Sequence, residues 1–281
     1  MSLDKIIKGK DHDELLYNIC CELKNAPEYS PRGQKTKEII NAHLELEDPY
    51  ARLITNPARK FSNKYVAAEI LWYLSGERSI EGIKDYASMW EKVANVDGTA
   101  NSAYGHQIFK MELPNYYGSQ YSWVVESLMQ DKDSRQALIN INLPEHKDIT
   151  TKDFTCTETI QYLIRDDKLY CINNMRSNDG IYGTGNDIPF FTFLQEMLLE
   201  DLKTLYSDLK MGSYYHNAGS LHIYEKHYNM LDNIIDTYEN LSPESCMMPQ
   251  INYKFLHEYH NGFKEKSSEL TKWLYNTKRG E

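Results

Sequence analysis

Two segments carry a cysteine and an arginine that could together form a nucleophilic site. Cys156 begins an expected strand, in the run DFTCT at residues 153–157, and Arg176 follows the next expected strand, in RSND at residues 176–179. An arginine close to a cysteine favours the thiolate, which is the reactive form of the side chain. The alternatives are an inert buried cysteine and a surface ion pair between Arg176 and Asp179.

Three further residues could handle protons or hydroxyl groups. Glu69 lies in an apolar run, between Ala68 and Ile70, where a carboxyl group tends to have a raised pKa that suits proton transfer. The alternative is that Glu69 marks the solvent-facing side of an amphipathic helix. His222 and Tyr224 are two apart on an expected strand and therefore point the same way. They could grip a hydroxyl group, or be core residues with polar tips.

Familiar catalytic and metal-binding motifs do not fit this sequence. His257 and His260 are three apart, whereas a zinc helix needs its two histidines four apart on one face. The glycines between Gly180 and Gly185 are not in the order of the dinucleotide fingerprint. A phosphate loop, a CxxC pair and a GxSxG elbow are also missing. We therefore predict no metal site.

The elements that must position these residues alternate between helical and strand-like patterns. Ser62 is a plausible N-cap for the helix that carries Glu69, and residues 165–167 form a compact hairpin connection. Together the elements predict a single α+β domain over residues 1–281. Helices are expected over residues 11–25, 62–75, 79–93, 121–130, 190–209, 225–239 and 253–275, and strands over residues 137–143, 157–164, 168–174 and 213–224.

Composition excludes several classes of function. The chain has 281 residues, of which 41% are hydrophobic and 26% charged, as is usual for soluble globular proteins. The formal net charge of −10 argues against general nucleic-acid binding, which depends on Lys and Arg contacts to phosphates. No signal peptide and no apolar run of about 18 residues occurs, so no membrane association is predicted. The five irregularly spaced cysteines favour a reduced, cytoplasmic chain.

A series of short motifs resembles, in order and spacing, the thymidylate synthase superfamily over roughly residues 30 to 230. Within that superfamily, residues 153–179 look most like the phage deoxycytidylate hydroxymethylases, including Thr157 where thymidylate synthases have histidine. The resemblance implies a mixed sheet flanked by helices and a homodimer packed sheet to sheet. The motifs are Glu69 with ILWYL, Met89-Trp90, Ser102-Ala103-Tyr104-Gly105, Asp133-Ser134-Arg135, the Cys156 segment, Gln161-Tyr162, the Arg176 segment and Gly219–Tyr224.

The resemblance places Asp187 at the position that reads the base, where thymidylate synthases have asparagine. A carboxylate accepts a hydrogen bond from the exocyclic amine of cytosine, whereas uracil would set a carbonyl oxygen against it. A mispaired buried polar group costs about 1–3 kcal/mol, so a cytidine monophosphate is the predicted substrate. An alternative role for Asp187 is a helix N-cap before Pro189.

The chemistry that the resemblance implies is covalent catalysis with 5,10-methylenetetrahydrofolate as co-substrate. The Cys156 thiolate attacks carbon 6 of the base, carbon 5 captures the one-carbon unit, and loss of tetrahydrofolate leaves an exocyclic methylene. A returned hydride then gives a methyl group, whereas added water gives a hydroxymethyl group. Glu69 is implied for proton transfer and for ordering that water. Tyr104 is implied as a catalytic residue beside the cysteine. Trp90 and Asp179 match folate-side positions, and Asp179 is also implied to be catalytic.

A phosphate site shared between subunits is also implied. Thymidylate synthases have two adjacent arginines, lent by the partner subunit, where this chain has Arg135 and Gln136, so one bidentate phosphate contact is missing. The active form would be a homodimer with shared sites. The substrate-binding residues implied besides Asp187 are Arg32, Arg135, Arg176, Ser177, His222 and Tyr224.

We therefore predict a folate-dependent hydroxymethylase of dCMP, in the host cytoplasm if the source is a phage. Residues 272–281 do not resemble the apolar tail that thymidylate synthases close over folate, which favours the addition of water. Residues 240–281 form a helical extension to which no function is assigned. The alternatives are a CMP hydroxymethylase, a pyrimidine nucleotide C5-methylase that makes 5-methyl-dCMP or thymidylate, and a non-catalytic relative that binds nucleotide or messenger RNA.

Overall fold

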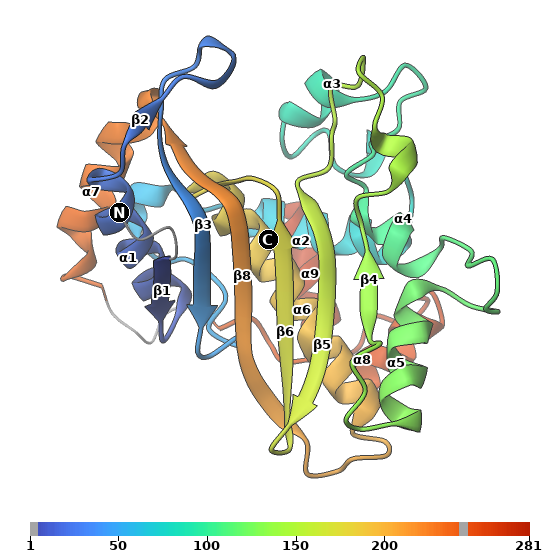
Figure 1. The fold of residues 1–281 in the computed structure, drawn as a ribbon. Helices are drawn as coiled ribbons and strands as arrows, with labels where there is room; N and C mark the ends of the chain where they lie inside the picture. The colour runs from blue at the N-terminus through green and yellow to red at the C-terminus, as the bar shows by residue number, and fades with distance from the viewer. Residues whose placement is uncertain (1–4, 242–246) are drawn as a thin grey trace. The chain divides into compact units, whose positions relative to one another are not determined.

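The computed structural model in Figure 1 describes residues 5–241 and 247–281 and divides the chain into two units. Both units are discontinuous in sequence, so the chain passes between them several times. Whether they act as the single domain that we expect stays a prediction. Unit 1 comprises Met1–Phe61, Tyr170–Leu194 and Met211–Met248, and unit 2 comprises Ser62–Leu169, Gln195–Lys210 and Pro249–Glu281.

Unit 1 contains a mixed sheet. Its central strand β3 pairs in parallel with β1 and antiparallel with β8, and β6 follows β8 in the strand order. Two short strands extend it, since β2 pairs with β3 and β7 pairs in parallel with β8. The strands are β1 (Lys5–Gly9), β2 (Glu28–Tyr29), β3 (Thr36–Leu46), β6 (Lys168–Met175), β7 (Asn178–Asp179) and β8 (Lys210–Tyr224).

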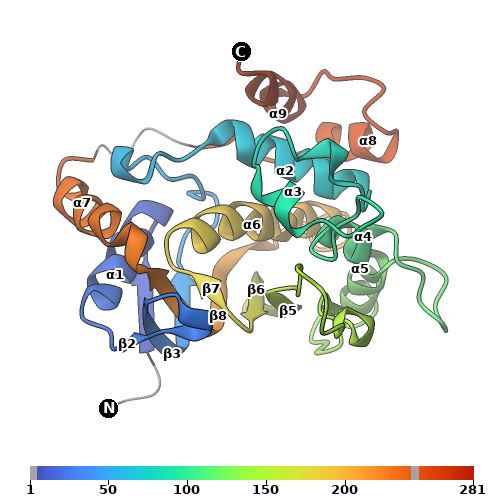
Figure 2. The same cartoon turned by 90° about the horizontal axis from the view of Figure 1, so that it is seen from above.

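Helices α1 (His12–Lys24) and α7 (Tyr228–Tyr238) also belong to unit 1 and lie side by side, as Figure 2 shows. The apolar face of α1 that the sequence predicts is buried, which is the usual reason that an amphipathic helix is stable in a protein. Tyr17 on α1 stacks on Tyr238 on α7, with 4.2 Å between the ring centroids.

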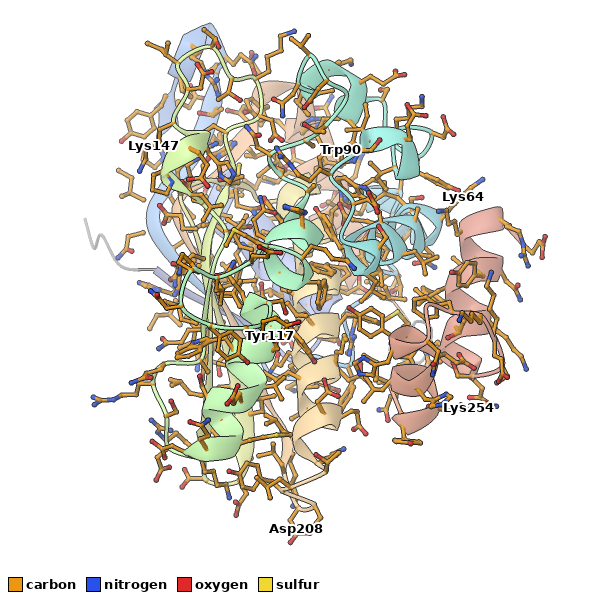
Figure 3. The ribbon with its side chains drawn as sticks, turned by 90° about the vertical axis from the view of Figure 1, so that its right-hand side faces the viewer. Lys64, Trp90, Tyr117, Lys147, Asp208 and Lys254 are labelled. Atoms are coloured by element: carbon orange, nitrogen blue, oxygen red, sulfur yellow. The ribbon has the colours of Figure 1, made fainter. Side chains whose placement is uncertain are left out.

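Unit 2 is mainly helical. Helix α2, which lies wholly within this unit, carries Glu69. Ser62 caps α2 as predicted, because its hydroxyl accepts a hydrogen bond from the Tyr65 amide at 3.1 Å. α9 packs against α2, which Lys64 marks in Figure 3. The elements are α2 (Asn63–Ser75), α3 (Met89–Val93), α4 (Tyr104–Phe109), α5 (Gln120–Gln130), α8 (Tyr253–His260), α9 (Glu269–Arg279), β4 (Leu138–Asn140) and β5 (Thr157–Arg165).

The predicted hairpin between β5 and β6 is confirmed. Asp166 and Asp167 join the two strands, and both have positive φ values, of 49° and 55°. Aspartate tolerates this left-handed region better than most residues, and two-residue hairpin turns require it. Strand pairing also confirms the mixed sheet of the predicted α+β class.

The helix expected over residues 190–209 is wrong in its bounds, because α6 runs from Tyr182 to Leu202. One Asp179 oxygen accepts the amides of Ile181 and Tyr182, at 2.9 and 2.7 Å, and so caps the start of the helix. Asp187 therefore lies inside the helix rather than at its N-cap. Pro189 is also within the helix, although proline removes an interior hydrogen bond.

Two other predicted helices are interrupted. The segment over residues 79–93 forms a 3-10 turn at Ile80–Gly82 and the short helix α3, because the backbone around Ser79 pairs with Thr99 instead. The tail expected as one helix over residues 253–275 forms α8 and α9. Its break lies at Gly262 and Phe263, which both have positive φ. Across the described residues, no helix has the length and apolar character needed to cross a membrane.

Candidate active site

In unit 2, Glu69 is buried and held by a tyrosine one helical turn earlier. The Tyr65 hydroxyl donates to Glu69 Oε1 at 2.5 Å, and the ring nitrogen of Trp90 donates to the Tyr65 oxygen at 3.3 Å. Glu69 is 6% exposed and Trp90 is 3% exposed. The interpretation of Glu69 as the solvent-facing side of its helix is therefore wrong. A buried carboxylate that accepts a hydrogen bond from a fixed tyrosine keeps a defined orientation, as a proton-transfer group requires.

The cysteine segment is tied to the segment that begins α4. The Asp153 carboxylate accepts from the Ser102 amide at 2.7 Å and from the Ser102 hydroxyl, and the Asn101 side chain donates to the Asp153 carbonyl oxygen at 2.9 Å. These bonds fix the chain three residues before Cys156 to the chain two residues before Tyr104. Cys156 itself is half-buried and forms no disulfide within the described residues.

Tyr104 is held close to α2 by its neighbours. Its ring stacks on Tyr73 with 5.6 Å between centroids, and the next residue, Gly105, lies so close to α2 that a Cβ there would meet the Tyr73 carbonyl oxygen at 1.9 Å. Only glycine permits such a close backbone approach. The stacked ring pair and the close approach thus place α4 firmly on the helix that carries Glu69.

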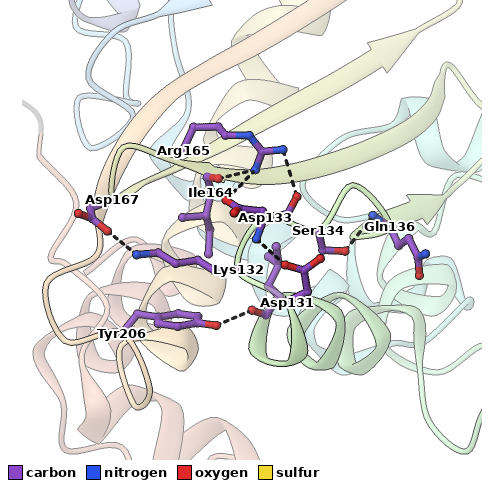
Figure 4. Close-up of polar contacts among 10 residues, drawn as sticks. Asp131, Lys132, Asp133, Ser134, Gln136, Ile164, Arg165, Asp167 and Tyr206 are labelled. Atoms are coloured by element: carbon purple, nitrogen blue, oxygen red, sulfur yellow. Dashed lines mark hydrogen bonds and ion pairs between the residues drawn. The ribbon is translucent and has the colours of Figure 1, made fainter.

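Arg135 is exposed, and it follows a turn that is pinned by ionic and polar contacts (Figure 4). Arg165 on β5 donates to the Asp133 carbonyl oxygen at 3.1 Å, and Lys132 forms an ion pair with Asp167. The Gln161 side chain donates to the Arg135 carbonyl oxygen at 3.0 Å. The backbone of Arg135 is thus fixed, while its side chain makes no ion pair within the described residues.

In unit 1, several predicted substrate residues gather where β6 ends and β7 runs beside β8. Arg176 and Ser177 connect β6 to β7, and both are half-buried. Asp179 is the register partner of His222, whose carbonyl oxygen accepts the Gly180 amide at 2.7 Å. The rings of His222 and Tyr224 lie edge to face, 5.1 Å apart.

Asp187 reaches the same region from the second turn of α6. Its Oδ2 accepts a hydrogen bond from the Asn178 side chain at 2.6 Å. Burial raises the pKa of Asp187 to about 7, although the Asn178 hydrogen bond acts to lower it. The carboxyl group therefore titrates near neutral pH, and proton-exchanging sites commonly have such pKa values.

No described contact ties Arg32 to the other predicted substrate residues, and the same holds for Arg135. Arg32 lies on the turn Pro31–Gly33, within the connection between β2 and β3 that Figure 1 shows in blue. Its side chain is exposed and its backbone is left-handed, with φ of 52°.

The donor atoms of Asp179 bear on whether this region could bind a metal ion or an organic co-substrate. Within the described residues, no group of three or more His, Cys, Asp or Glu side chains could hold a metal. Asp179 uses one carboxylate oxygen to cap α6, and its other oxygen has no partner among the described residues, so it can accept from an N–H-bearing heterocycle. Trp90 is buried, and its role in a folate site stays a prediction.

Two residues of the candidate site were missed. Tyr65 lies four residues before Glu69, a spacing at which helical side chains meet, so its contact could have been predicted. Asn178 stands between two predicted residues in RSND. Its contact with Asp187 depends on the early start of α6, which the apolar pattern does not reveal.

A family model and several known proteins match most of this chain. The model of the thymidylate synthase family matches residues 13–266. The deoxycytidylate 5-hydroxymethyltransferase of Enterobacteria phage T2 is 34% identical over 214 residues, which are 74% of this chain and 83% of the relative. The enzyme of the same name from phage T4 is 34% identical over 207 residues, which are 71% of this chain and 80% of the relative.

Two more distant relatives extend the comparison. The deoxyuridylate hydroxymethyltransferase of Bacillus phage SP01 is 28% identical over 212 residues, which are 72% of this chain and 54% of that protein. Among solved structures, the thermostable thymidylate synthase A of Bacillus subtilis superposes with a TM-score of 0.65 at 18% identity, over 85% of each chain. At that identity the likeness concerns the fold alone.

Proposed function

This chain belongs to the thymidylate synthase family, and within that family we propose that it is a deoxycytidylate 5-hydroxymethyltransferase. The reaction converts dCMP, 5,10-methylenetetrahydrofolate and water to 5-hydroxymethyl-dCMP and tetrahydrofolate. The observation that carries the proposal is the carboxylate of Asp187, held through one oxygen by Asn178, at the position expected to read the base. The likeness to the phage T2 and T4 enzymes supports it.

Base recognition follows from the chemistry of the carboxylate. Asn178 occupies Oδ2 of Asp187, which leaves Oδ1 to accept from the exocyclic amine of cytosine. An ionised Oδ1 would repel the corresponding carbonyl oxygen of uracil. Arg176, Ser177, His222 and Tyr224 are proposed to hold the sugar and phosphate of the same nucleotide.

Covalent catalysis is assigned to Cys156. Its thiolate would attack carbon 6 of the base and make carbon 5 nucleophilic. When bound, 5,10-methylenetetrahydrofolate would supply the one-carbon unit, and the family resemblance assigns Asp179 and Trp90 to its recognition. Glu69, oriented by Tyr65, would accept and return protons and order the water that forms the hydroxymethyl group.

The proposal also includes an oligomeric state and a cellular location. Arg135 would bind phosphate in the partner subunit of a homodimer, as the resemblance implies. None of the four described cysteines forms a disulfide, which supports the cytoplasmic location that we propose.

The test is to run the reaction with dCMP in ¹⁸O-labelled water and to weigh the product. We expect a product that has gained CH₂O with the label in its new hydroxyl group, together with tetrahydrofolate. A gain of CH₂ with release of dihydrofolate would contradict the proposal and show a methylase. Cys156→Ala should abolish turnover and leave dCMP binding intact.

A further inference from the structure

Asn178 is more deeply buried than the carboxyl group it contacts. It is 4% exposed, whereas Asp187 is half-buried. Its backbone lies in β7 and is fixed by parallel pairing with Leu221 of β8. The amide nitrogen is directed at Asp187 Oδ2 at 2.6 Å, and the amide oxygen is buried without a hydrogen-bond partner. A buried polar atom is left unpaired in few native sites, so this orientation is unusual enough to need a reason.

Gly183 explains how Asn178 fits at this place. A Cβ atom on Gly183 would lie 2.3 Å from the Asn178 amide oxygen and 3.0 Å from its amide carbon. Any side chain at position 183 would therefore push the amide away from Asp187. Gly183 lies in the glycine-rich start of α6, which matches no dinucleotide motif. The Asn178–Asp187 contact therefore requires a glycine at this position.

We propose that Asn178 is a positioning and specificity residue, which fixes Asp187 and keeps it ionised so that the site rejects uracil. This inference rests on the proposed function. An ionised Asp187 offers uracil only an acceptor facing its carbonyl oxygen. A protonated Asp187 could instead donate its O–H to that oxygen and so accept dUMP. The amide N–H of Asn178 favours the ionised form, since hydrogen bonding to a charged group stabilises the charge.

Besides Asn178, the groups around Asp187 do little to stabilise its charged form. Among the described residues, the titratable side chain that interacts with the Asp187 charge is Tyr214 on β8. Burial, with smaller contributions from Cys171 and Asp187, raises the pKa of Tyr214 well above its ordinary value, so the tyrosine stays neutral. No cation is found to stabilise Asp187 in the described part of the chain. The Asn178 amide is therefore the group that opposes the effect of burial.

The experiment measures Asp187 and base preference separately. The pKa of Asp187 is read by ¹³C NMR of carboxyl-labelled protein, with Asp187→Asn used for assignment. Binding of dCMP and of dUMP is measured by calorimetry without folate, on both sides of the pKa of about 7. In the wild type we expect dUMP binding to strengthen as pH falls through that value, because protonation creates the missing donor.

Asn178→Asp and Asn178→Ala should both raise the pKa of Asp187. The first is isosteric and places a second carboxyl group at hydrogen-bond distance, and like charges disfavour ionisation. Above neutral pH, the preference for dCMP over dUMP should fall roughly tenfold or more, which is the usual effect of losing a hydrogen bond to a charged group. Gly183→Ala should shift both readouts in the same direction.

Asn217→Ala is the matched control. Asn217 is a half-buried amide on β8 that contacts His43 and Asn174 and has no described contact with Asp187. An unchanged Asp187 pKa in both Asn178 variants, or a loss of affinity equal for the two nucleotides, would overturn the inference. A wild type without preference for dCMP would instead count against the proposed function, even if the pKa shift is found.

Discussion

At the scale of one residue, the structure holds the buried carboxylate of Glu69 in a defined orientation. The side chain lies in the interior of α2, with Tyr65 one turn before it and Trp90 donating to the tyrosine. The sequence places an acid among apolar neighbours, and the structure adds the chain of donors that orients it. In the proposed mechanism, this orientation decides whether Glu69 can order a water molecule.

Tyr65→Phe tests that orientation. The variant keeps the ring in its buried place and removes the hydroxyl that donates to Glu69. We expect kcat for dCMP to fall roughly ten- to a hundredfold with little change in KM, because a hydrogen bond to a charged group contributes about 1.5–3 kcal/mol. Steady-state kinetics provide the measurement.

Tyr121→Phe is the control for this prediction. Tyr121 donates to Asp201 at 2.6 Å in the same unit and is not part of the proposed site. Equal losses of kcat in the two variants would show that Tyr65 has a general structural role and no specific effect on Glu69.

At the scale of elements, the helices and strands with one clear pattern could be predicted, and those fixed by distant contacts could not. α2, β5 and β6 have the expected bounds to within a residue or two, because periodicity, an N-cap and turn residues agree. α6 starts eight residues earlier than expected, since Asp179 caps it from β7. The sequence therefore predicts a role for Asp187 but could not show that Asn178 holds its side chain.

The break between α8 and α9 is another feature that local pattern does not reveal. The buried Glu258 carboxylate accepts the amides of Ser267 and Ser268, at 2.7 and 2.8 Å, and both of their hydroxyl groups. Burial alone would raise the pKa of Glu258, but the hydrogen bonds from Thr271, Ser267 and Ser268 outweigh it and lower the pKa to about 2. One side chain thus joins the two helices.

Glu258→Gln should destabilise this junction. Because the folded-state pKa lies below the ordinary value of 4.5, the carboxylate contributes stability above about pH 4.5 and loses it as pH falls toward 2. We expect the variant to lose about 1–3 kcal/mol of unfolding free energy at neutral pH and to depend less on pH in that range. Urea denaturation measures both effects.

Glu265→Gln provides the comparison, since Glu265 is an exposed carboxylate in the same connection. Hydrogen exchange should become faster in α8 and α9 of the Glu258 variant alone. Equal exchange in the two variants would contradict the assigned role.

At the scale of the whole molecule, two buried histidines make folding dependent on pH. Burial lowers the pKa of His12 to about 4 and that of His216 to about 3. In the folded chain both side chains stay neutral down to these lowered pKa values. In the unfolded chain they take up protons below the ordinary histidine pKa of 6.5. Stability from these groups is therefore full above about pH 6.5 and is lost as pH falls toward 4 and below.

The double variant His12→Gln/His216→Gln should show a weaker loss of stability between about pH 6.5 and 4 than the wild type. The raised pKa of Asp187, about 7, makes its contribution to stability grow as pH falls. The two proteins are therefore compared by the difference between their stabilities at each pH. Thermal unfolding followed across this range measures it. As a control, the substitution His257→Gln at an exposed position should leave the dependence of stability on pH unchanged. The same pH dependence in the double variant as in the wild type would refute the argument.

The proposed homodimer with shared sites can be tested by complementation. Cys156→Ala and Arg135→Ala should each inactivate the enzyme, but mixed dimers would contain one site with an intact Cys156 and an intact Arg135 from the partner. After unfolding and refolding of an equal mixture, we expect roughly a quarter of the wild-type rate, from random pairing in a symmetric dimer. Activity that stays at the level of the separate variants would contradict shared sites.

The central claim is that this member of the thymidylate synthase family hydroxymethylates a cytosine nucleotide. The most direct measurement offers dCMP, CMP and dUMP together, in equal amounts, to the purified enzyme with 5,10-methylenetetrahydrofolate and weighs the products. The account predicts that dCMP is consumed first and gains CH₂O. Consumption of dUMP in preference to dCMP would contradict the assignment of Asp187 as the residue that selects cytosine.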